Sequence, residues 1–177
     1  VTRYAAFLRA INVGGRTVKM EQLRTVFEGL RLKDVRTVIN SGNVLFTSGA
    51  KDEAALERKI ERALADALGY EVVTFLRTAS EIATIAKREP FPDAPEKELV
   101  QVGYLKTKPT AAVRRAVEAL ATDKDELQVI GRELHWHVRG RTMDSLIKPN
   151  VMGTALGGPT TVRNTTTVRR IAGLLQE

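Results

Sequence analysis

Apolar and polar positions follow different periods along the first part of the chain, which predicts strands interrupted by helices. Residues 3–9 form a nearly continuous apolar run, as expected of a buried strand. A glycine loop follows, and after it a helix whose apolar residues recur on one face: Met20, Leu23, Val26, Phe27 and Leu30. The pattern thus changes from that of a strand to that of a helix within this first segment.

Two runs rich in β-forming residues come next, at residues 34–39 and 43–47. Asn40, Ser41 and Gly42 separate them. Asn and Gly accept the positive φ angles that a tight turn needs, so the two runs predict a β-hairpin.

A long helix is predicted between Asp52 and Gly69, because Asp is a favourable N-cap and Gly commonly ends a helix. Residues 71–77 then predict another strand. The order up to this point is βαββαβ. This is the order of the ferredoxin-like unit, an antiparallel sheet with two helices on one face.

After this unit, Thr78 and Glu81 form a capping box that opens a short helix, and the segment 90–97 is rich in proline. A similar order then begins again, without a repeated motif: strands at 99–106, 127–130 and 134–138, and a helix at 110–120. The helix expected next is a single turn at 144–147 at most, and residues 148–163 predict a loop rich in glycine and threonine. Asn164 or a nearby Thr caps a last helix.

We therefore predict an α+β protein of two ferredoxin-like halves, the second irregular, with a C-terminal helix. The expected boundaries are 1–77 for the first half, 78–98 for a helix and a proline-rich linker, and 99–177 for the second half with the C-terminal helix. We expect the first half to be the more regular one, because only it has the complete βαββαβ order.

Composition and charge narrow the range of functions. The 177 residues are 43% hydrophobic, which is enough for a core, and they include no cysteine, which excludes disulfides and thiol catalysis. No apolar stretch reaches the length of a membrane span and the start does not resemble a signal peptide, so we expect a cytoplasmic protein with no membrane partner. The net charge of +7 favours anionic partners, namely phosphorylated metabolites, nucleic acid or an acidic protein surface.

The first candidate site is the loop after the first strand. Arg9 could bind an anion through its forked guanidinium and Asn12 through a neutral contact, and Gly14 and Gly15 allow backbone N–H groups to approach a ligand. The start of the next helix adds a field that favours an anion. The sequence is neither a P-loop nor a dinucleotide-binding fingerprint, and a plain tight turn explains the same residues.

Two further segments are candidates. The turn Ser41-Gly42-Asn43 lies between the second and third strands, although hairpin geometry alone accounts for its Gly and Asn. Near the C-terminus, Arg163, Asn164 and Thr167 surround the start of the last helix. A cation there is opposed to the helix dipole unless it shares an anion with the helix start, and solvent exposure explains it equally well.

Histidines occur only at positions 135 and 137, where they flank Trp136 in a predicted strand, so both imidazoles face one side and the indole the other. Two histidines at this spacing can begin a metal site, but no compact set of acidic partners accompanies them, and we predict no metal. We predict no cofactor. No catalytic residue can be assigned from these patterns, so whether the chain is an enzyme stays open.

Three segments together resemble a known family: YAAFLRAINVGGRTVKMEQLRTVFEGL, VRTVINSGNVLF and TVRNTTTV. They are similar to the motifs of domain of unknown function family 1697, found in uncharacterised bacterial proteins. The resemblance spans almost the whole chain and implies two ferredoxin-like halves with no established activity. It departs from the family pattern at Ala10, where Gly is usual, and at Thr165, where Trp is usual.

A binder of, or an enzyme acting on, a small phosphorylated or carboxylated molecule fits these residues best, at the loop after the first strand. A nucleic-acid-binding module is the first alternative; we expect it to show only weak, non-specific binding, because acidic residues interleave with basic ones. A structural or protein-interaction domain is the second. We expect the first loop and the Ser41-Gly42-Asn43 turn at opposite ends of the sheet, so that one pocket need not hold all three segments.

Overall fold

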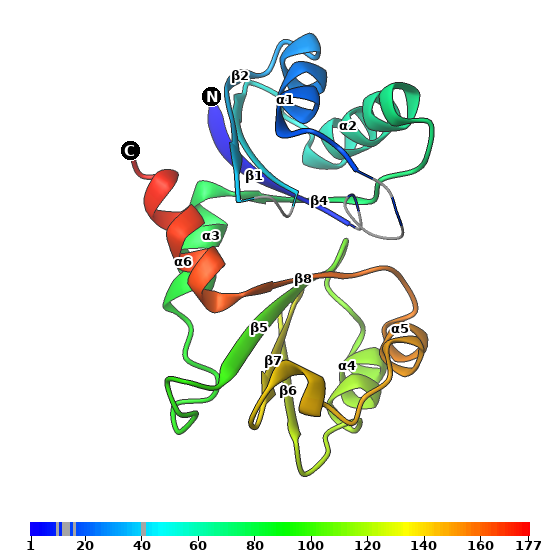
Figure 1. The fold of residues 1–177 in the computed structure, drawn as a ribbon, viewed down its shortest axis with the longest axis vertical. Coiled ribbons are helices and arrows are strands. Elements are labelled where there is room, and N and C mark those ends of the chain that lie inside the picture. Colours follow the sequence, from blue (N-terminus) through cyan, green and yellow to red (C-terminus); the bar gives the residue numbers. More distant parts are fainter. Residues whose placement is uncertain (10, 12–14, 16, 40–41) are drawn as a thin grey trace. The chain divides into compact units, whose positions relative to one another are not determined.

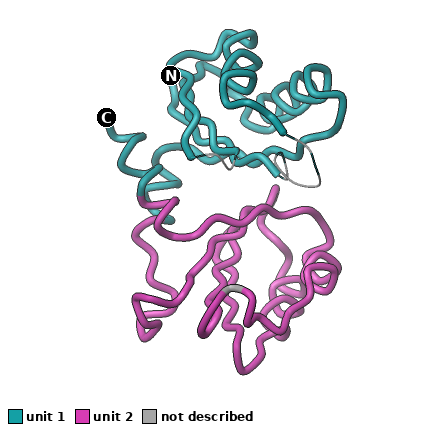
Figure 2. Tube along the Cα trace, viewed as in Figure 1, with its two compact units in different colours: residues 1–85, 170–177 teal, residues 86–169 magenta. Residues whose placement is uncertain are grey.

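The computed structural model describes the chain except for residues 10, 12–14, 16, 40 and 41 and the side chain of Thr142 (Figure 1). The chain divides into two compact units (Figure 2). The first consists of residues 1–85 with 170–177, and the second of residues 86–169. No helix in the described part of the chain combines the length and the apolar character needed to cross a membrane.

The first unit contains the predicted βαββαβ order: β1 (Thr2–Leu8), α1 (Met20–Gly29), β2 (Lys33–Val38), β3 (Asn43–Ser48), α2 (Glu53–Leu68) and β4 (Thr74–Thr78). The strands form one sheet in the order β2-β3-β1-β4, and every neighbouring pair is antiparallel. The prediction of an antiparallel ferredoxin-like first half is confirmed. Helix α3 (Ala79–Lys87) follows directly after β4.

Helices α1 and α2 lie on the same face of this sheet (Figure 1). Their apolar stripes are buried there, and Phe27 of α1 packs against Phe46 of β3 with ring centroids 5.5 Å apart. The predicted ends of α2 are confirmed. The Asp52 carboxylate accepts a hydrogen bond of 3.0 Å from the N–H of Ala55, and Gly69 ends the helix with a φ angle of 81°.

The second unit has the same order of elements: β5 (Leu99–Tyr104), α4 (Ala111–Glu118), β6 (Asp125–Ile130), β7 (Glu133–Val138), the 3-10 turn η1 (Thr142–Asp144), α5 (Pro149–Leu156) and β8 (Thr161–Asn164). Its antiparallel sheet runs β6-β7-β5-β8, which repeats the first sheet strand for strand. Helix α6 (Thr165–Leu174) follows β8 as α3 follows β4.

The prediction of a loop over residues 148–163 is wrong, because this stretch holds both α5 and β8. Pro149 occupies the first turn of α5, where a missing N–H costs nothing, and Gly157 ends the helix with a φ angle of 69°. Met152 anchors α5 in the core of the unit. The second half therefore also has the βαββαβ order, with η1 and the short α5 in place of a single long helix.

The last strands of the two units also end alike. Arg77 of β4 and Arg163 of β8 are both buried, and each donates a hydrogen bond to the carbonyl of the residue before it, at 2.8 and 2.9 Å. The following residues, Thr78 and Asn164, then cap α3 and α6 through their side chains. The capping box of Thr78 with Glu81 is formed as predicted.

Candidate functional site

Two of the three candidate segments meet at one end of the first sheet. The N–H of Leu8, at the end of β1, donates a hydrogen bond of 2.8 Å to the carbonyl of Gly42. The expectation that these segments lie at opposite ends is wrong. Strand β3 is antiparallel to β1, so its first residue, Asn43, pairs with Phe7 near the end of β1, and the turn before it lies beside the β1 exit.

A third connection, between α2 and β4, reaches the same end of the sheet. The carbonyl of Val73 accepts a hydrogen bond of 2.9 Å from the N–H of Arg9. The hydroxyl of Tyr70 lies 3.5 Å from the carbonyl of Ile11. We call this region, made of the described residues in 8–15, 42–43 and 70–73, the loop end of the first sheet.

Gly42 fits this region in a way that another residue would not. Its φ angle is 74°, and a Cβ atom added to it would lie 3.0 Å from Cδ1 of Ile11 and 3.2 Å from Cβ of Leu8. Ile11 is itself buried. The turn and the β1 exit loop are therefore packed against each other, and the glycine is needed for that approach.

The predicted ligand-binding residues of this region differ in their surroundings. Asn43 is fully buried, and its side-chain amide donates a hydrogen bond of 3.0 Å to the carbonyl of Val38, across the hairpin. Gly15 has a φ angle of 79°, and an added Cβ would have no atom within 4 Å. Asn12, Gly14 and Ser41 lie outside the described residues, as does Ala10.

The side chain of Arg9 is exposed, and it forms no ion pair with any residue that the structure describes. Arg9 is therefore not half of a buried ion pair within the described chain. Arg9 instead places a permanent positive charge on an exposed loop, next to the docked glycine turn. This arrangement can hold an anion.

The third candidate segment belongs to the second unit. Arg163 is 9% exposed and donates hydrogen bonds to the hydroxyl of Thr161 at 2.7 Å and to the carbonyl of Val162 at 2.9 Å. Burial lowers the pKa of Arg163 to about 10, against an opposing effect of Tyr104. Asn164 accepts a hydrogen bond of 2.8 Å from the N–H of Thr167, so the predicted cap of the last helix is confirmed.

A polar cluster around the two histidines escaped sequence analysis. His137 lies between two carboxylates, with Nδ1 2.7 Å from Oε2 of Glu126 and Nε2 2.7 Å from Oε2 of Glu98. Trp136 faces the opposite side of the sheet and packs against the apolar core, as predicted. Glu126 could have been found from the sequence, because a hairpin with Gly131 and Arg132 in its two-residue turn places it opposite His137. The sequence around Glu98 contains nothing that indicates its contact with His137.

The cluster leaves no ring nitrogen of His137 open to a ligand. Nδ1 faces the carboxylate of Glu126 and Nε2 faces that of Glu98, so both ring nitrogens already have a partner. The hydrogen bond from His137 is the main reason that the pKa of Glu98 lies below its usual value. Among the described residues, no group of three or more histidine or acidic side chains is arranged to hold a metal ion.

His135 lies on the same face of the sheet and is buried. Its Nε2 is 3.3 Å from Nη1 of Arg88, which also pairs with Glu133 at 2.7 Å. Burial is the main cause that lowers the pKa of His135 to about 4; the charge of Arg88 adds to it, and that of Glu133 opposes it. His135 is therefore a neutral, buried group near neutral pH.

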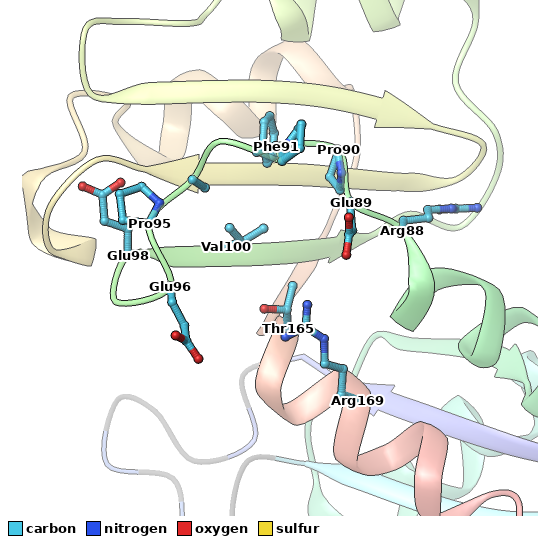
Figure 3. Close-up of a pocket in the computed structure, with 12 residues that line it drawn as sticks. Arg88, Glu89, Pro90, Phe91, Pro95, Glu96, Glu98, Val100, Thr165 and Arg169 are labelled. Atoms are coloured by element: carbon cyan, nitrogen blue, oxygen red, sulfur yellow. The ribbon is translucent and has the colours of Figure 1, made fainter.

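A hollow of about 240 Å³ lies beside the proline-rich segment of this unit. In Figure 3, Thr165 and Arg169 of α6 face it from one side, Pro90 and Phe91 from another, and Val100 lies between them. Its lining carries charges of both signs. The carboxylates belong to Glu89, Glu96 and Glu98, and the guanidinium groups to Arg88 and Arg169. This mixture gives the hollow no clear preference for an anion.

Comparison with known proteins agrees with the motifs. The model of a family described as "Protein of unknown function (DUF1697)" matches residues 1–135. The chain belongs to this family. One solved structure, described as conserved bacterial protein SP0830 from Streptococcus pneumoniae, is 24% identical, with a TM-score of 0.78 and 99% of each chain covered. That likeness extends the shared fold over the entire chain. No curated protein matches the chain.

Thr165 is one of the residues that line the hollow of about 240 Å³ beside the proline-rich segment. The resemblance of the sequence to the family implies Trp at this position, where the chain has the much smaller Thr side chain.

Proposed function

We propose that the chain binds a small anionic molecule, phosphorylated or carboxylated, at the loop end of the first sheet. The observation that carries this proposal is the exposed side chain of Arg9, which forms no ion pair with a described carboxylate and directly follows Leu8, the residue bonded to the turn at Gly42. Forked N–H donors suit the planar carboxylate and the phosphate group equally.

The neighbouring backbone supports the same ligand class. Helix α1 begins after Lys19, whose side chain makes no capping hydrogen bond. The first amides of a helix point outward and carry a partial positive charge, which an anion can satisfy. Asn12, Gly14 and Ser41 belong to the proposal through their positions in the sequence, and Gly15 through its open backbone.

A thermal-shift screen of phosphate, pyrophosphate and small carboxylates tests the proposal. A ligand that binds only the folded chain raises the melting temperature by an amount that grows with its concentration. We expect this rise in the wild type and its loss in Arg9→Met. Arg31→Met is the matched control, because Arg31 is also exposed but precedes β2 at the opposite end of the sheet. Equal responses in both variants would contradict the proposal.

A further inference from the structure

The second unit repeats the backbone geometry of the loop end. The N–H of Leu105 donates to the carbonyl of Arg132 at 3.0 Å, as the N–H of Leu8 donates to that of Gly42 at 2.8 Å. The strand pairings next to these bonds correspond as well. Tyr104 pairs with Glu133 in the second unit, as Phe7 pairs with Asn43 in the first. The residue after Leu105 is Lys106, so a basic side chain follows the corresponding strand in both units.

Lys106 borders a hollow of about 340 Å³ between the β5–α4 loop and the α5–β8 loop. The described residues that line it include a second cation, Lys108, and no carboxylate. This sets it apart from the hollow beside the proline-rich segment, where both signs of charge are present. Two cations border this one hollow, and their charge favours an anionic ligand over a cationic one.

The rest of the lining is apolar or backbone. Leu105, Val113 and Leu156 contribute side chains, and the last two also pack against the core of the unit. Gly157 and Gly158 also line it, and an added Cβ at either would have no atom within 4 Å. The backbone there is open to a ligand, and the volume is at the lower end of the range for small-molecule sites.

We propose that this hollow is a second binding site, for a molecule with one phosphate or carboxylate group on a small apolar body. Lys106 and Lys108 bind the anionic group, while Leu105, Val113 and Leu156 contact the apolar part. The apolar wall distinguishes this ligand from a free inorganic ion, which gains nothing from it. All of its lining residues belong to the second unit, whereas Arg9 belongs to the first.

The test is an NMR titration of the full chain with phenyl phosphate, benzoate and inorganic phosphate, followed at the amides of Gly157 and Gly158. We expect phenyl phosphate or benzoate to shift these amides, with a stronger response than to inorganic phosphate. Their relative affinities identify the anionic group. The variant Lys106→Met/Lys108→Met should bind at least about tenfold more weakly, since each charge-assisted contact is typically worth a factor of that order.

Two controls make the result specific. Lys97→Met/Lys124→Met removes the same charge from exposed positions of the same unit and should change affinity by less than about twofold. Arg9→Met should leave the response of Gly157 and Gly158 unchanged, whatever its effect at the loop end. Unshifted glycine amides, an equal loss in both lysine variants, or a stronger response to inorganic phosphate would each overturn the proposal.

Discussion

Leu8 and Gly42 are joined by a hydrogen bond of 2.8 Å between the end of β1 and the turn before β3. This bond brings together two segments that lie more than thirty positions apart in the sequence. Both were singled out from the sequence for their glycines and polar residues. Their meeting at one end of the sheet is the structural basis for the site that we propose there.

Replacing Gly42 with Ala should destabilise the first unit. The new residue would have to adopt a φ angle of 74° with its Cβ 3.0 Å from Cδ1 of Ile11. Left-handed backbone and overpacking together suggest a loss of about 2 to 4 kcal/mol in the free energy of unfolding, measurable by urea denaturation. Gly49→Ala is the control, because a Cβ there meets no atom within 4 Å. Similar losses in the two variants would contradict the packing described for the turn.

His135 should make the chain less stable in mild acid. Its pKa falls from 6.5 to about 4 in the folded chain, so between these values the unfolded chain binds the proton and the folded one does not. Stability is complete above pH 6.5 and decreases as the pH falls toward 4. The shift corresponds to a loss of up to about 3 kcal/mol.

Denaturation at a series of pH values measures this effect, with His135→Gln as the comparison. The variant cannot take up the proton, so its stability should vary less across the window. A wild-type curve that runs parallel to that of the variant would contradict a neutral, buried His135.

The sequence predicted those helix ends that depend only on residues close to them in the chain. Asp52 and Gly69 set the ends of α2, and Thr78 with Glu81 opens α3, because a cap depends only on residues within one helical turn. Helix α5 escaped prediction. Gly153 interrupts its short apolar pattern, although Pro149 at its start and Gly157 at its end are ordinary helix signals.

Long-range pairings were harder to predict. The contact of Glu98 with His137 joins residues 39 positions apart, and no pattern around Glu98 announces it. The position of the Ser41-Gly42-Asn43 turn beside the β1 exit follows from strand direction, once β1 and β3 are known to be antiparallel neighbours. Placing the turn there required the order and direction of the strands, which the residue types of the turn do not give. The candidate residue Arg9 came from the sequence, whereas its backbone hydrogen-bond partner Val73 did not.

Thr165→Trp should fill part of the hollow beside the proline-rich segment. The indole would bury apolar area against the prolines and Val100 that line it, with a gain of about 1 kcal/mol and a rise of about 2 to 4 °C in melting temperature. Thr166→Trp is the control, because Thr166 is exposed. A lower melting temperature for Thr165→Trp than for the control would show that the hollow does not accept the side chain.

Binding to nucleic acid should be weak and sensitive to salt. The chain has a net charge of +7, but on α2 the basic residues alternate with acidic ones, for example Arg58 and Lys59 between Glu57 and Glu61. Counterion release makes such binding decrease log-linearly with salt concentration, and we expect none at about 0.15 M. Fluorescence anisotropy with a labelled oligonucleotide measures it. Tight binding at that salt would favour a nucleic-acid-binding module instead.

The most direct test of the proposed function is a phosphate titration followed by NMR at the amides of Gly15 and Gly42, with Arg9→Met alongside the wild type. Because Arg9 is exposed, the variant should keep its free energy of unfolding within about 1 kcal/mol. We predict that both amides shift with saturation in the wild type and that neither shifts in Arg9→Met. Unchanged amides in the wild type, or the same shifts in the variant, would contradict an anion site at the loop end.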